Sequence, residues 1–401
     1  MKILNVSQNY FVKGGSDSYF FELETLLKRR GHEVVPFVAK NPANRPSEWS
    51  DFFPDGADFE RPGLKDVGRY IYSSQAKTHI ANLFGRFTPE LAHFHIYYGK
   101  VTASVLNEFR KRGIPIVQTL HEYKLICPVY TCFRDGEICE KCSPGHYASV
   151  LLHRCNRDSL VRSALSFVEA AVSHKLGAIA GIDHFISVSH FHRKKMIEKG
   201  IPAGKVSTVH NFLNLDAFRP SHSVGKYVLY YGRIEKLKGL DTFVAAAKLL
   251  PGIRFAIAGD GAYKAQLVEV VTQQKIENVE FLGFITGEKL HDTVRESVCT
   301  VLPAQWYENC PMSVLETLAL GRPALGTDIG GIPELIQDSV DGYVFKVGNA
   351  YQLAEKIEGL WMRRHDAAIE MGAAGRAKVQ AEFGEERHYR KLLEIYAAVT
   401  N

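Results

Sequence analysis

Short apolar runs alternate with longer segments of helical periodicity along most of this chain. The first run, Lys2–Val6, is followed by a glycine-containing turn and by a helix predicted over Tyr19–Arg30. In such a pattern each helix crosses over one face of a parallel sheet, and the helices together cover both faces. The alternation therefore predicts an α/β fold. The expected strands are Lys2–Val6, Glu33–Val38, Leu91–Ile96, Ile114–Leu120, Phe185–Val188 and Val206–Val209, then Tyr227–Gly232, Phe255–Ala258, Val279–Leu282, Thr300–Pro303, Pro323–Gly326 and Gly342–Phe345.

The strand–turn–helix pattern restarts after Ser221-His222-Ser223, which we expect to be a hinge. A chain of 401 residues is long enough for two domains, each with its own core. We therefore predict two Rossmann-like domains, 1–220 and 221–381, and a surface loop over 40–63. Ligands of such sheets bind at the carboxyl ends of the strands, so the active site is expected in the cleft between the domains.

Composition and charge narrow the function classes. The chain is 46% hydrophobic and 23% charged, which is ordinary for a globular protein. Residues 1–220 hold 29 Lys and Arg against 21 Asp and Glu, whereas residues 221–401 hold 20 against 23. The basic first half suggests an anionic partner such as phosphate or a lipid surface. The sequence has no dense basic run with interleaved aromatic residues, so it does not suggest a nucleic-acid partner.

The sequence has no apolar stretch approaching about 18 residues, so no membrane-spanning helix is predicted. The apolar run at the N-terminus is too short for the core of a signal peptide. A cytoplasmic protein is therefore expected.

Candidate chemistry is densest over residues 303–335. A strand is predicted to end at Pro303, and Pro311 suits the start of a helix. Glu308 and Glu316 could accept hydrogen bonds from sugar and ribose hydroxyls. The alternative is a capped amphipathic helix with an exposed glutamate. The open amides that could bind a diphosphate at this helix start are those of Asn309, Met312 and Ser313.

A second candidate follows the first strand of the second half, in Gly232-Arg233-Ile234-Glu235-Lys236-Leu237-Lys238-Gly239. Arg233 and Lys238 beside a glycine turn could clamp a phosphate, although a solvated basic loop is the alternative. Gly259-Asp260-Gly261 also follows a strand, and alone it is an ordinary turn.

In the first half, Gly14-Gly15 follows the first strand and would let a ligand approach the backbone. The segment lacks the Gly-x-Gly-x-x-Gly fingerprint, which argues against a nicotinamide or flavin cofactor. His121 ends the fourth strand, and His93 and His95 end the strand before it on the same face. A lone histidine at such a place is more often structural.

Together these residues resemble the family 4 retaining glycosyltransferases, also called glycosyl transferases group 1, which have the GT-B fold. The similarity covers essentially the whole chain and is that of the polysaccharide-biosynthesis type. It implies two Rossmann-like domains facing across a cleft, and a final helix over 382–401 that crosses back to the first. The matching motifs are Gly14-Gly15, His121, Gly-Arg233-x4-Lys238-Gly239, Gly259-Asp-Gly261, Glu308-x7-Glu316 and Asp328-x-Gly330-Gly331-x-Pro-Glu334.

The resemblance also implies residue roles. Arg233 and Lys238 would bind the donor diphosphate, Glu308 the transferred sugar and Glu316 the ribose. His121 would lie at the reaction centre. The other expected donor-binding residues are Gly14, Gly15, Gly261, Phe284, Ile285, Asn309, Met312 and Ser313. Asn309-Cys310 after Glu308 departs from the family, where many members have Gly or Phe.

The expected reaction is a metal-independent hexosyl transfer without a cofactor, because paired cations and helix amides can stabilise the leaving diphosphate. Retention of configuration follows from the resemblance alone. A UDP-sugar is the favoured donor and a GDP-sugar the alternative. The acceptor would be a saccharide or a lipid-linked intermediate of a surface polysaccharide or glycolipid. Two other classes stay open: a sugar-nucleotide epimerase, and a non-catalytic sugar-nucleotide-binding protein.

Two further features stand outside these motifs. Cys127, Cys132, Cys139 and Cys142 have spacings that suit a structural zinc site, or they are reduced buried thiols. The segment 141–205 holds ten Lys and Arg against four acidic residues. It includes the basic helix His190–Lys199, which either rests on an anionic membrane or is simply solvated.

Overall fold

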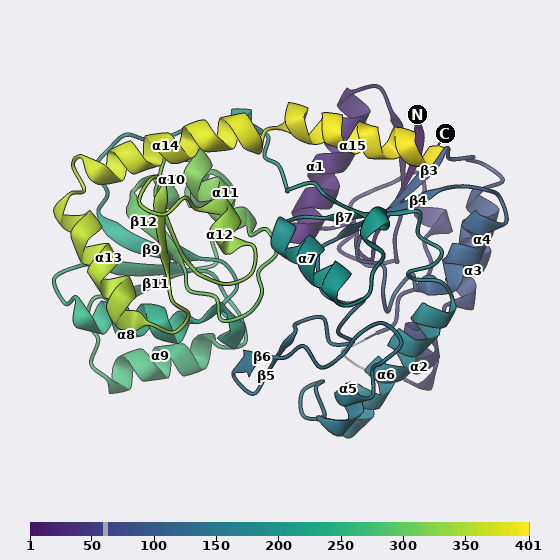
Figure 1. The fold of residues 1–401 in the computed structure, drawn as a ribbon, viewed down its shortest axis with the longest axis horizontal. Helices are drawn as coiled ribbons and strands as arrows, with labels where there is room; N and C mark the ends of the chain where they lie inside the picture. Colours follow the sequence, from purple (N-terminus) through teal and green to yellow (C-terminus); the bar gives the residue numbers. More distant parts are fainter. Residues whose placement is uncertain (59–62, 401) are drawn as a thin grey trace. The chain divides into compact units, whose positions relative to one another are not determined.

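The computed structural model describes residues 1–58 and 63–400 of the chain. The chain divides into two compact units, each with its own six-stranded parallel sheet (Figure 1). The first unit contains residues 1–134, 138–210 and 388–401. The second contains residues 135–137 and 211–387.

The sheet of the first unit has the order β2-β1-β3-β4-β7-β8. The chain leaves β1 toward β2 and then returns to pair β3 with the other edge of β1, so the topological switch point lies between β1 and β3. The strands are β1 Lys2–Val6, β2 Glu33–Phe37, β3 Leu91–Phe94, β4 Ile116–Leu120, β7 His184–Ser187 and β8 Val206–Thr208. The helices are α1 Gly15–Arg29, α2 Leu64–Ile71, α3 Ser74–Leu83, α4 Leu106–Arg110, α5 Ser149–Leu152, α6 Leu160–Lys175, α7 His190–Glu198 and α15 Glu385–Thr400.

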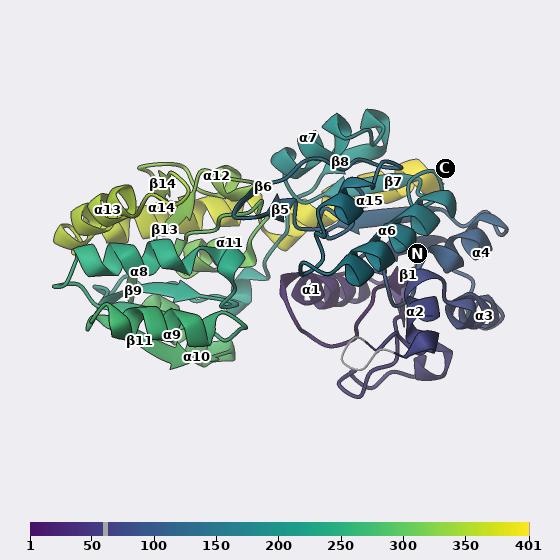
Figure 2. The ribbon, with the colours of Figure 1, turned by 90° about the horizontal axis from the view of Figure 1, so that it is seen from below.

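The sheet of the second unit has the order β11-β10-β9-β12-β13-β14, which places its switch point between β9 and β12. Helices cover both of its faces, as the right-handed crossovers of parallel sheets require (Figure 2). The strands are β9 Tyr227–Tyr231, β10 Phe255–Ala258, β11 Val279–Gly283, β12 Ser297–Leu302, β13 Ala324–Thr327 and β14 Gly342–Phe345. The helices are α8 Leu240–Leu249, α9 Lys264–Gln273, α10 Gly287–Arg295, α11 Met312–Ala319, α12 Ile332–Leu335, α13 Ala350–Met362 and α14 Ala367–Glu382.

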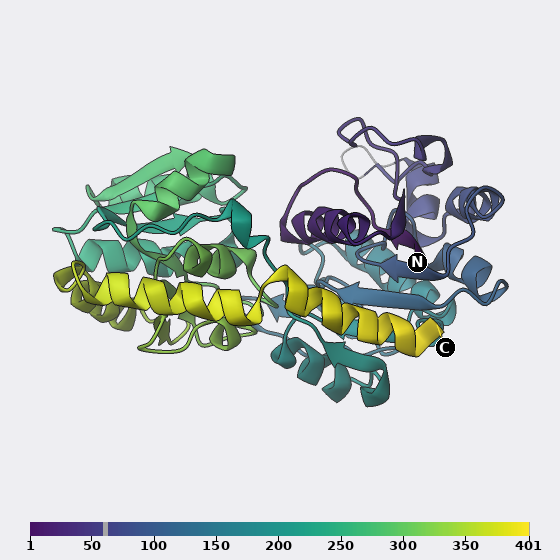
Figure 3. The same cartoon turned by 90° about the horizontal axis from the view of Figure 1, so that it is seen from above.

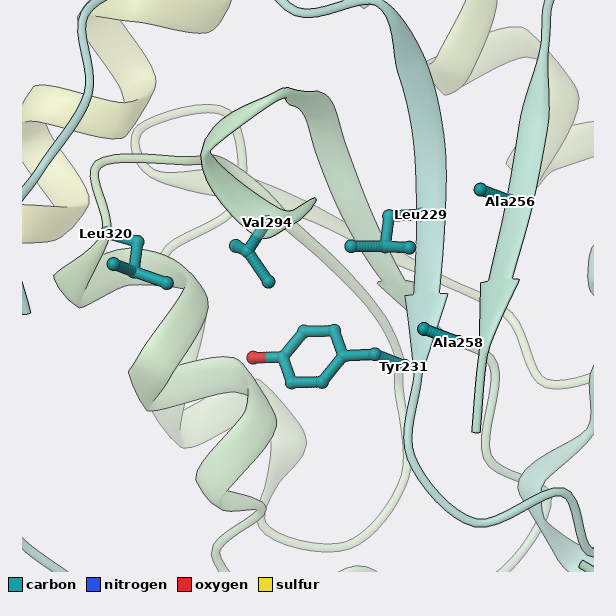
Figure 4. Close-up of a cluster of buried hydrophobic side chains, with 6 residues drawn as sticks. All are labelled: Leu229, Tyr231, Ala256, Ala258, Val294 and Leu320. Atoms are coloured by element: carbon teal, nitrogen blue, oxygen red, sulfur yellow. The ribbon is translucent and has the colours of Figure 1, made fainter. Parts of the chain in front are cut away.

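One part of the second core lies between the sheet and the helices α10 and α11. Side chains of β9 and β10 meet Val294 of α10 and Leu320, which follows α11 (Figure 4). The central strands are buried on both faces, and this explains why their sequences are nearly continuous apolar runs.

The structure corrects several predicted ends. Helix α1 begins at Gly15 rather than Tyr19, because a carboxylate oxygen of Asp17 accepts hydrogen bonds from the N–H groups of Lys13 and Gly14 and so caps the earlier turn. Part of the expected 40–63 loop packs inside the first unit, since Phe53 is buried beside Tyr10. Residues 59–62 of that prediction lie outside the described residues.

The C-terminal prediction also changes. Glu382 is the last residue of α14, and the final helix α15 starts at Glu385. Between them the Phe383 carbonyl accepts a hydrogen bond from the Leu213 N–H, at 3.0 Å, which interrupts the helix. Within residues 1–58 and 63–400, no helix combines the length and the apolar character needed to cross a membrane.

The expected hinge at Ser221–Ser223 lies within the second unit, because the division between the units falls at 210/211. The guanidinium of Arg322, whose side chain is fully buried, donates a hydrogen bond to the Ser223 carbonyl at 2.8 Å and another to Ser221 Oγ at 3.3 Å. These bonds hold the segment against the second unit.

Alanine substitutions at two glycines in neighbouring helices can test how closely α14 (yellow in Figure 3) packs against the rest of the second unit. A Cβ at Gly372 in α14 would lie 2.0 Å from the Gly321 carbonyl oxygen, whereas a Cβ at Gly359 in α13 would meet nothing within 4 Å. Gly372→Ala should therefore destabilise the protein by about 1–3 kcal/mol through overpacking. Gly359→Ala should stabilise it by about 0.5–1 kcal/mol through helix propensity. Thermal melts of both variants test this, and equal melting temperatures would contradict it.

Candidate functional site

Two loops meet at the switch point of the second unit. One joins β9 to α8 and contains Lys238, and the other joins β12 to α11 and contains Glu308. They pack backbone against backbone, because the Gln305 N–H donates to the Leu237 carbonyl at 2.9 Å. Gly239 has φ of 70°, and a Cβ there would lie 1.9 Å from the Pro303 carbonyl oxygen. Only glycine permits this approach.

Lys238 and Glu308 form an ion pair across these loops. Lys238 Nζ lies 2.5 Å from Glu308 Oε1, and the side chains are 14% and 10% exposed. Trp306 Nε1 donates to the same carboxylate oxygen at 2.7 Å. The backbone of Glu308 is fixed as well, because its carbonyl accepts from the Gly331 N–H at 2.6 Å. An ammonium carries three donors, so Lys238 can hold Glu308 and an anion together.

Arg233 lies on the β9–α8 loop but is far more open to solvent. Its side chain is 58% exposed and pairs with Glu235 at 2.8 Å. An exposed ion pair of this kind contributes little energy, so the guanidinium could exchange Glu235 for a phosphate at small cost.

Gly261, predicted to bind the donor, has a packing role in this structure. A Cβ at Gly261 would lie 2.4 Å from the Ile234 carbonyl oxygen, and its φ of 158° further disfavours a side chain. The Ile234 N–H donates to the Asp260 carbonyl at 2.8 Å. The loop after β10 therefore supports the Arg233 loop from beside it.

The middle of α11 carries Glu316 near a buried tyrosine of β9. Tyr231 donates its hydroxyl proton to the Ser313 carbonyl at 2.5 Å, and the same hydroxyl lies 3.5 Å from Glu316 Oε2. Burial raises the pKa of Glu316 to about 7, and the nearby Tyr231 hydroxyl only partly opposes this. Burial likewise raises the pKa of Tyr231 well above 10, so it remains a hydroxyl donor.

The other residues predicted on this segment lie at the helix start. Pro311 is the N-cap of α11, and Met312 and Ser313 form its first turn with partly exposed side chains. Their N–H groups are among those that an α-helix leaves without an intrahelical partner. The Cys310 carbonyl, one residue past Asn309, accepts from Asn211 Nδ2 at 3.0 Å, which ties this turn to the start of the second unit.

Phe284 and Ile285, in the turn between β11 and α10, point to different surroundings. The Phe284 side chain is 77% exposed. Ile285 packs on the cluster that contains Leu229 and Tyr231. Of these two predicted residues, only Ile285 therefore lies against the core of the second unit.

In the first unit, the predicted His121 ends a chain of hydrogen bonds that starts in β1. His95 Nε2 donates to Asn5 Oδ1 at 2.9 Å, so His95 Nδ1 is the acceptor for His121 Nε2 at 3.1 Å. The two imidazole rings are stacked, with centroids 5.4 Å apart. Asn5 and His95 thereby fix both the tautomer and the orientation of His121.

This histidine cluster is electrically neutral at neutral pH. Burial lowers the pKa of His93 and of His121 to about 3, and it lowers the pKa of His95 well below 6.5. Residues of α15 extend the cluster: Tyr396 contacts His93 Nδ1 at 2.5 Å, and His388 Nε2 contacts the Tyr19 hydroxyl at 3.0 Å. The C-terminal helix is thus part of the site's support.

Gly14 and Gly15 follow β1 at the same edge of the sheet. Gly14 is the N-cap of α1 with an extended φ of −165°, which any residue can adopt, and a Cβ there would meet nothing within 4 Å. The packing of the chain itself therefore does not require glycine at position 14.

Sequence reasoning missed Asn5, Trp306 and Tyr231 as members of these sites. Asn5 could have been noticed as a polar residue within an apolar strand, and Trp306 as a neighbour of Glu308. Tyr231 resembles any other apolar strand residue, so only the fold shows its contact with Ser313 and Glu316.

Comparison with known families gives matches over nearly all of the chain. The family profile described as Glycosyltransferase Family 4 matches residues 13–217, and that described as Glycosyl transferases group 1 matches residues 216–377. The amylovoran biosynthesis glycosyltransferase AmsK of Erwinia amylovora is 28% identical over 52% of this chain and 55% of its own length. The N-acetyl-alpha-D-glucosaminyl L-malate synthase of Bacillus anthracis is 26% identical over 96% and 93%. The chain spans little more than half the length of the curated relatives that it matches most strongly.

Solved structures share the fold. The sucrose-phosphate synthase of Thermosynechococcus elongatus has a TM-score of 0.74 at 19% identity, covering 99% of this chain and 98% of that one. Anabaena HepE in complex with UDP-glucose has a TM-score of 0.67 at 15% identity, covering 99% and 100%. The prediction of two Rossmann-like units in a GT-B fold is confirmed.

The raised pKa of Glu316 makes stability depend on pH. Between about pH 4.5 and 7 the unfolded chain loses this proton before the folded protein does, so the free energy of unfolding falls as pH rises. Glu316→Gln, which cannot ionise, should remove on the order of 1–3 kcal/mol of that fall. Thermal denaturation at pH 5 and pH 8 measures it, with Glu355→Gln on α13 as the control. Identical pH profiles for wild type and Glu316→Gln would contradict the assignment.

Proposed function

This chain belongs to glycosyltransferase family 4, and we propose that it transfers a hexosyl group from a nucleotide-sugar to a saccharide or lipid-linked acceptor. The observation that carries the proposal is the Lys238–Glu308 pair at the switch point of the second unit, beside the start of α11. The second unit would bind the donor, and the first would bind the acceptor.

The charges in the second unit suit the departure of a nucleoside diphosphate. As the bond between the sugar and the phosphate breaks, negative charge grows on the diphosphate. Lys238, Arg233 and the N–H groups of Met312 and Ser313 would stabilise that charge without a metal ion. Glu308 would accept hydrogen bonds from the transferred sugar. Glu316 would accept them from the ribose, most strongly when it is ionised above about pH 7.

Retention is proposed to follow a front-face path. The bond from C1 to the diphosphate breaks while a bond from C1 to the acceptor oxygen forms on the same face. The acceptor proton passes to the leaving phosphate oxygen, so no enzyme carboxylate acts as nucleophile. His121 would lie beside the donor sugar as a neutral imidazole. A protonated ring there would oppose the positive charge that develops on the sugar, and desolvation prevents protonation.

A UDP-sugar is the favoured donor and a GDP-sugar the alternative. Support comes from HepE, whose solved complexes contain UDP or UDP-glucose. The match to AmsK, an amylovoran biosynthesis glycosyltransferase, supports a place in the synthesis of a surface polysaccharide.

Two lysines of one loop give a matched test of the mechanism. Lys238→Ala should lower turnover by at least about 10²-fold, because it removes a cation from the departing diphosphate. Lys236 instead contacts Asp241 at 2.7 Å and Tyr263 at 2.9 Å, so Lys236→Ala should keep most activity. Release of UDP or GDP from a panel of nucleotide-hexoses, with acceptor present, measures both.

The same assay separates the other two function classes. An epimerase would convert the donor sugar without releasing diphosphate, and a binding protein would show a ligand-induced thermal shift with no turnover. Near-normal turnover in Lys238→Ala would contradict the assigned mechanism.

A lipid-linked acceptor would require contact with a membrane, and the contacts made by α7 favour a different surface for it. Lys195 is only 18% exposed and pairs with Glu140 at 2.9 Å. Lys199, 19% exposed, also lies near Glu140, and Arg193 Nε donates to the Val206 carbonyl. Much of the basic charge predicted for this helix is therefore engaged within the first unit.

A more suitable surface lies at α5 and the start of α6, which we call the α5–α6 patch. Its large apolar side chains are open to solvent: Leu152 is 78%, Leu160 55% and Val161 80% exposed. Exposed arginines lie among them, and these are Arg154, Arg157 and Arg162. Apolar side chains with neighbouring cations suit insertion at the surface of an anionic bilayer.

Vesicle co-sedimentation tests the α5–α6 patch. Wild-type protein should sediment more with anionic than with neutral vesicles, and the double variant Val161→Asp/Arg162→Glu should lose most of that binding. Lys194→Glu, at a 73% exposed position of α7, is the control and should lose little. Equal recovery of wild type from both vesicles, or a larger loss in the control, would overturn the placement.

A further inference from the structure

Five of the seven cysteines surround a single cavity in the first unit. Cys127, Cys132, Cys139, Cys142 and Cys155 all line it. The sequence suggested only the first four as a group, and Cys155 joins them because the chain turns back after α5. All are thiols. The remaining two cysteines, Cys299 and Cys310, belong to the second unit.

The segment that carries these thiols has little regular structure to hold it. Between Cys127 and Cys155 the elements are two strands of two residues each, β5 Phe133–Arg134 and β6 Glu137–Ile138, and the four-residue helix α5. Tyr130, Cys132 and Asp135 have φ near 50°, a conformation that costs energy in residues other than glycine. A cross-link would stabilise a segment of this kind.

We propose that this cavity is a structural zinc site with four cysteine ligands, two of them Cys139 and Cys142 and the other two drawn from Cys127, Cys132 and Cys155. Cys139-x2-Cys142 is the paired spacing that commonly provides two zinc ligands from one turn. Four thiolates in a tetrahedral arrangement select zinc over harder cations.

The sulfur atoms converge on the cavity without yet forming a coordination shell. Among the described residues, no three of these Sγ atoms lie within 4.8 Å of one another. Zinc binding therefore requires rotation of cysteine side chains about χ1. On binding, four S–H bonds lose their protons to solvent as four Zn–S bonds form.

The surroundings can balance the charge of such a site. Zinc with four thiolates has a net charge of −2. Lys199, which lines the cavity, donates from Nζ to the Glu140 carbonyl at 2.5 Å, so its cation is held at the cavity wall. Lys195 pairs with the Glu140 carboxylate at 2.9 Å, so both lysines of the predicted basic helix have a role inside the unit.

The test uses the full chain purified under reducing conditions without chelators. Elemental analysis should find about one zinc per chain in wild type, and Cys142→Ser should lose it. Cys299→Ser, which alters a buried thiol of the second unit, should retain it. Of the variants Cys127→Ser, Cys132→Ser and Cys155→Ser, two should lose zinc and one should retain it, which identifies the cysteine that is not a ligand.

A second measurement needs no variant. Removal of metal by chelator should lower the melting temperature of wild-type protein, and added Zn²⁺ should restore it. Cobalt should bind the stripped protein with the visible bands of a tetrahedral thiolate site. Wild type without zinc or cobalt bands, or full zinc in Cys142→Ser, would overturn the proposal. Retention of zinc in all three of Cys127→Ser, Cys132→Ser and Cys155→Ser would also overturn it.

Discussion

The buried ion pair between Lys238 and Glu308 is the interaction on which the second unit's candidate site depends. Removing charges from water is costly, and the cost is offset only when the pair is tightly held and further hydrogen-bonded. Trp306 supplies the additional donor, and the close backbone contact of Gly239 with Pro303 brings the two loops into register. Breaking a buried pair on one side commonly costs about 3–5 kcal/mol, so each loop constrains the conformation of the other. The proposed phosphate site, if built on such loops, would be largely formed before any ligand arrives.

The strands were predictable because a parallel sheet covered on both faces needs continuous apolar runs, and β9, β10 and β12 have them. Errors came where a contact distant in sequence decides the outcome. The basic helix α7 looked free in sequence, yet Lys195 pairs with Glu140 from the cysteine segment. The supposed hinge at Ser221–Ser223 looked flexible, yet Arg322 bonds to it from a hundred residues away in the chain. Local composition does not contain these partners.

The candidate site likewise combines residues that the sequence predicted with contacts that only the fold shows. Spacing and family resemblance identified Lys238 and Glu308 as separate ligand-binding residues, but their contact with each other depends on which strands flank the switch point. His121 was flagged at a strand end, whereas Asn5 and His95 became its supports only once β1, β3 and β4 were placed side by side. Gly261 matched a binding motif, and the structure adds that the packing of two loops needs glycine at this position. The residue roles themselves remain predictions.

The candidate sites of the two units differ in charge, with ionised side chains in the second unit and neutral histidines in the first. This difference suits the proposed transfer reaction. In the second unit, cations and carboxylates stand at the strand ends, where a diphosphate would leave and hydroxyls would be recognised in the proposed reaction. In the first unit, burial holds His93, His95 and His121 neutral, and each is fixed by hydrogen bonds rather than by ion pairs. A sugar that becomes positively charged as its bond breaks is not opposed by neutral rings, whereas imidazolium groups would raise that barrier. In the proposed reaction, desolvation of the histidines would therefore contribute by excluding a charge, just as Lys238 would contribute by supplying one.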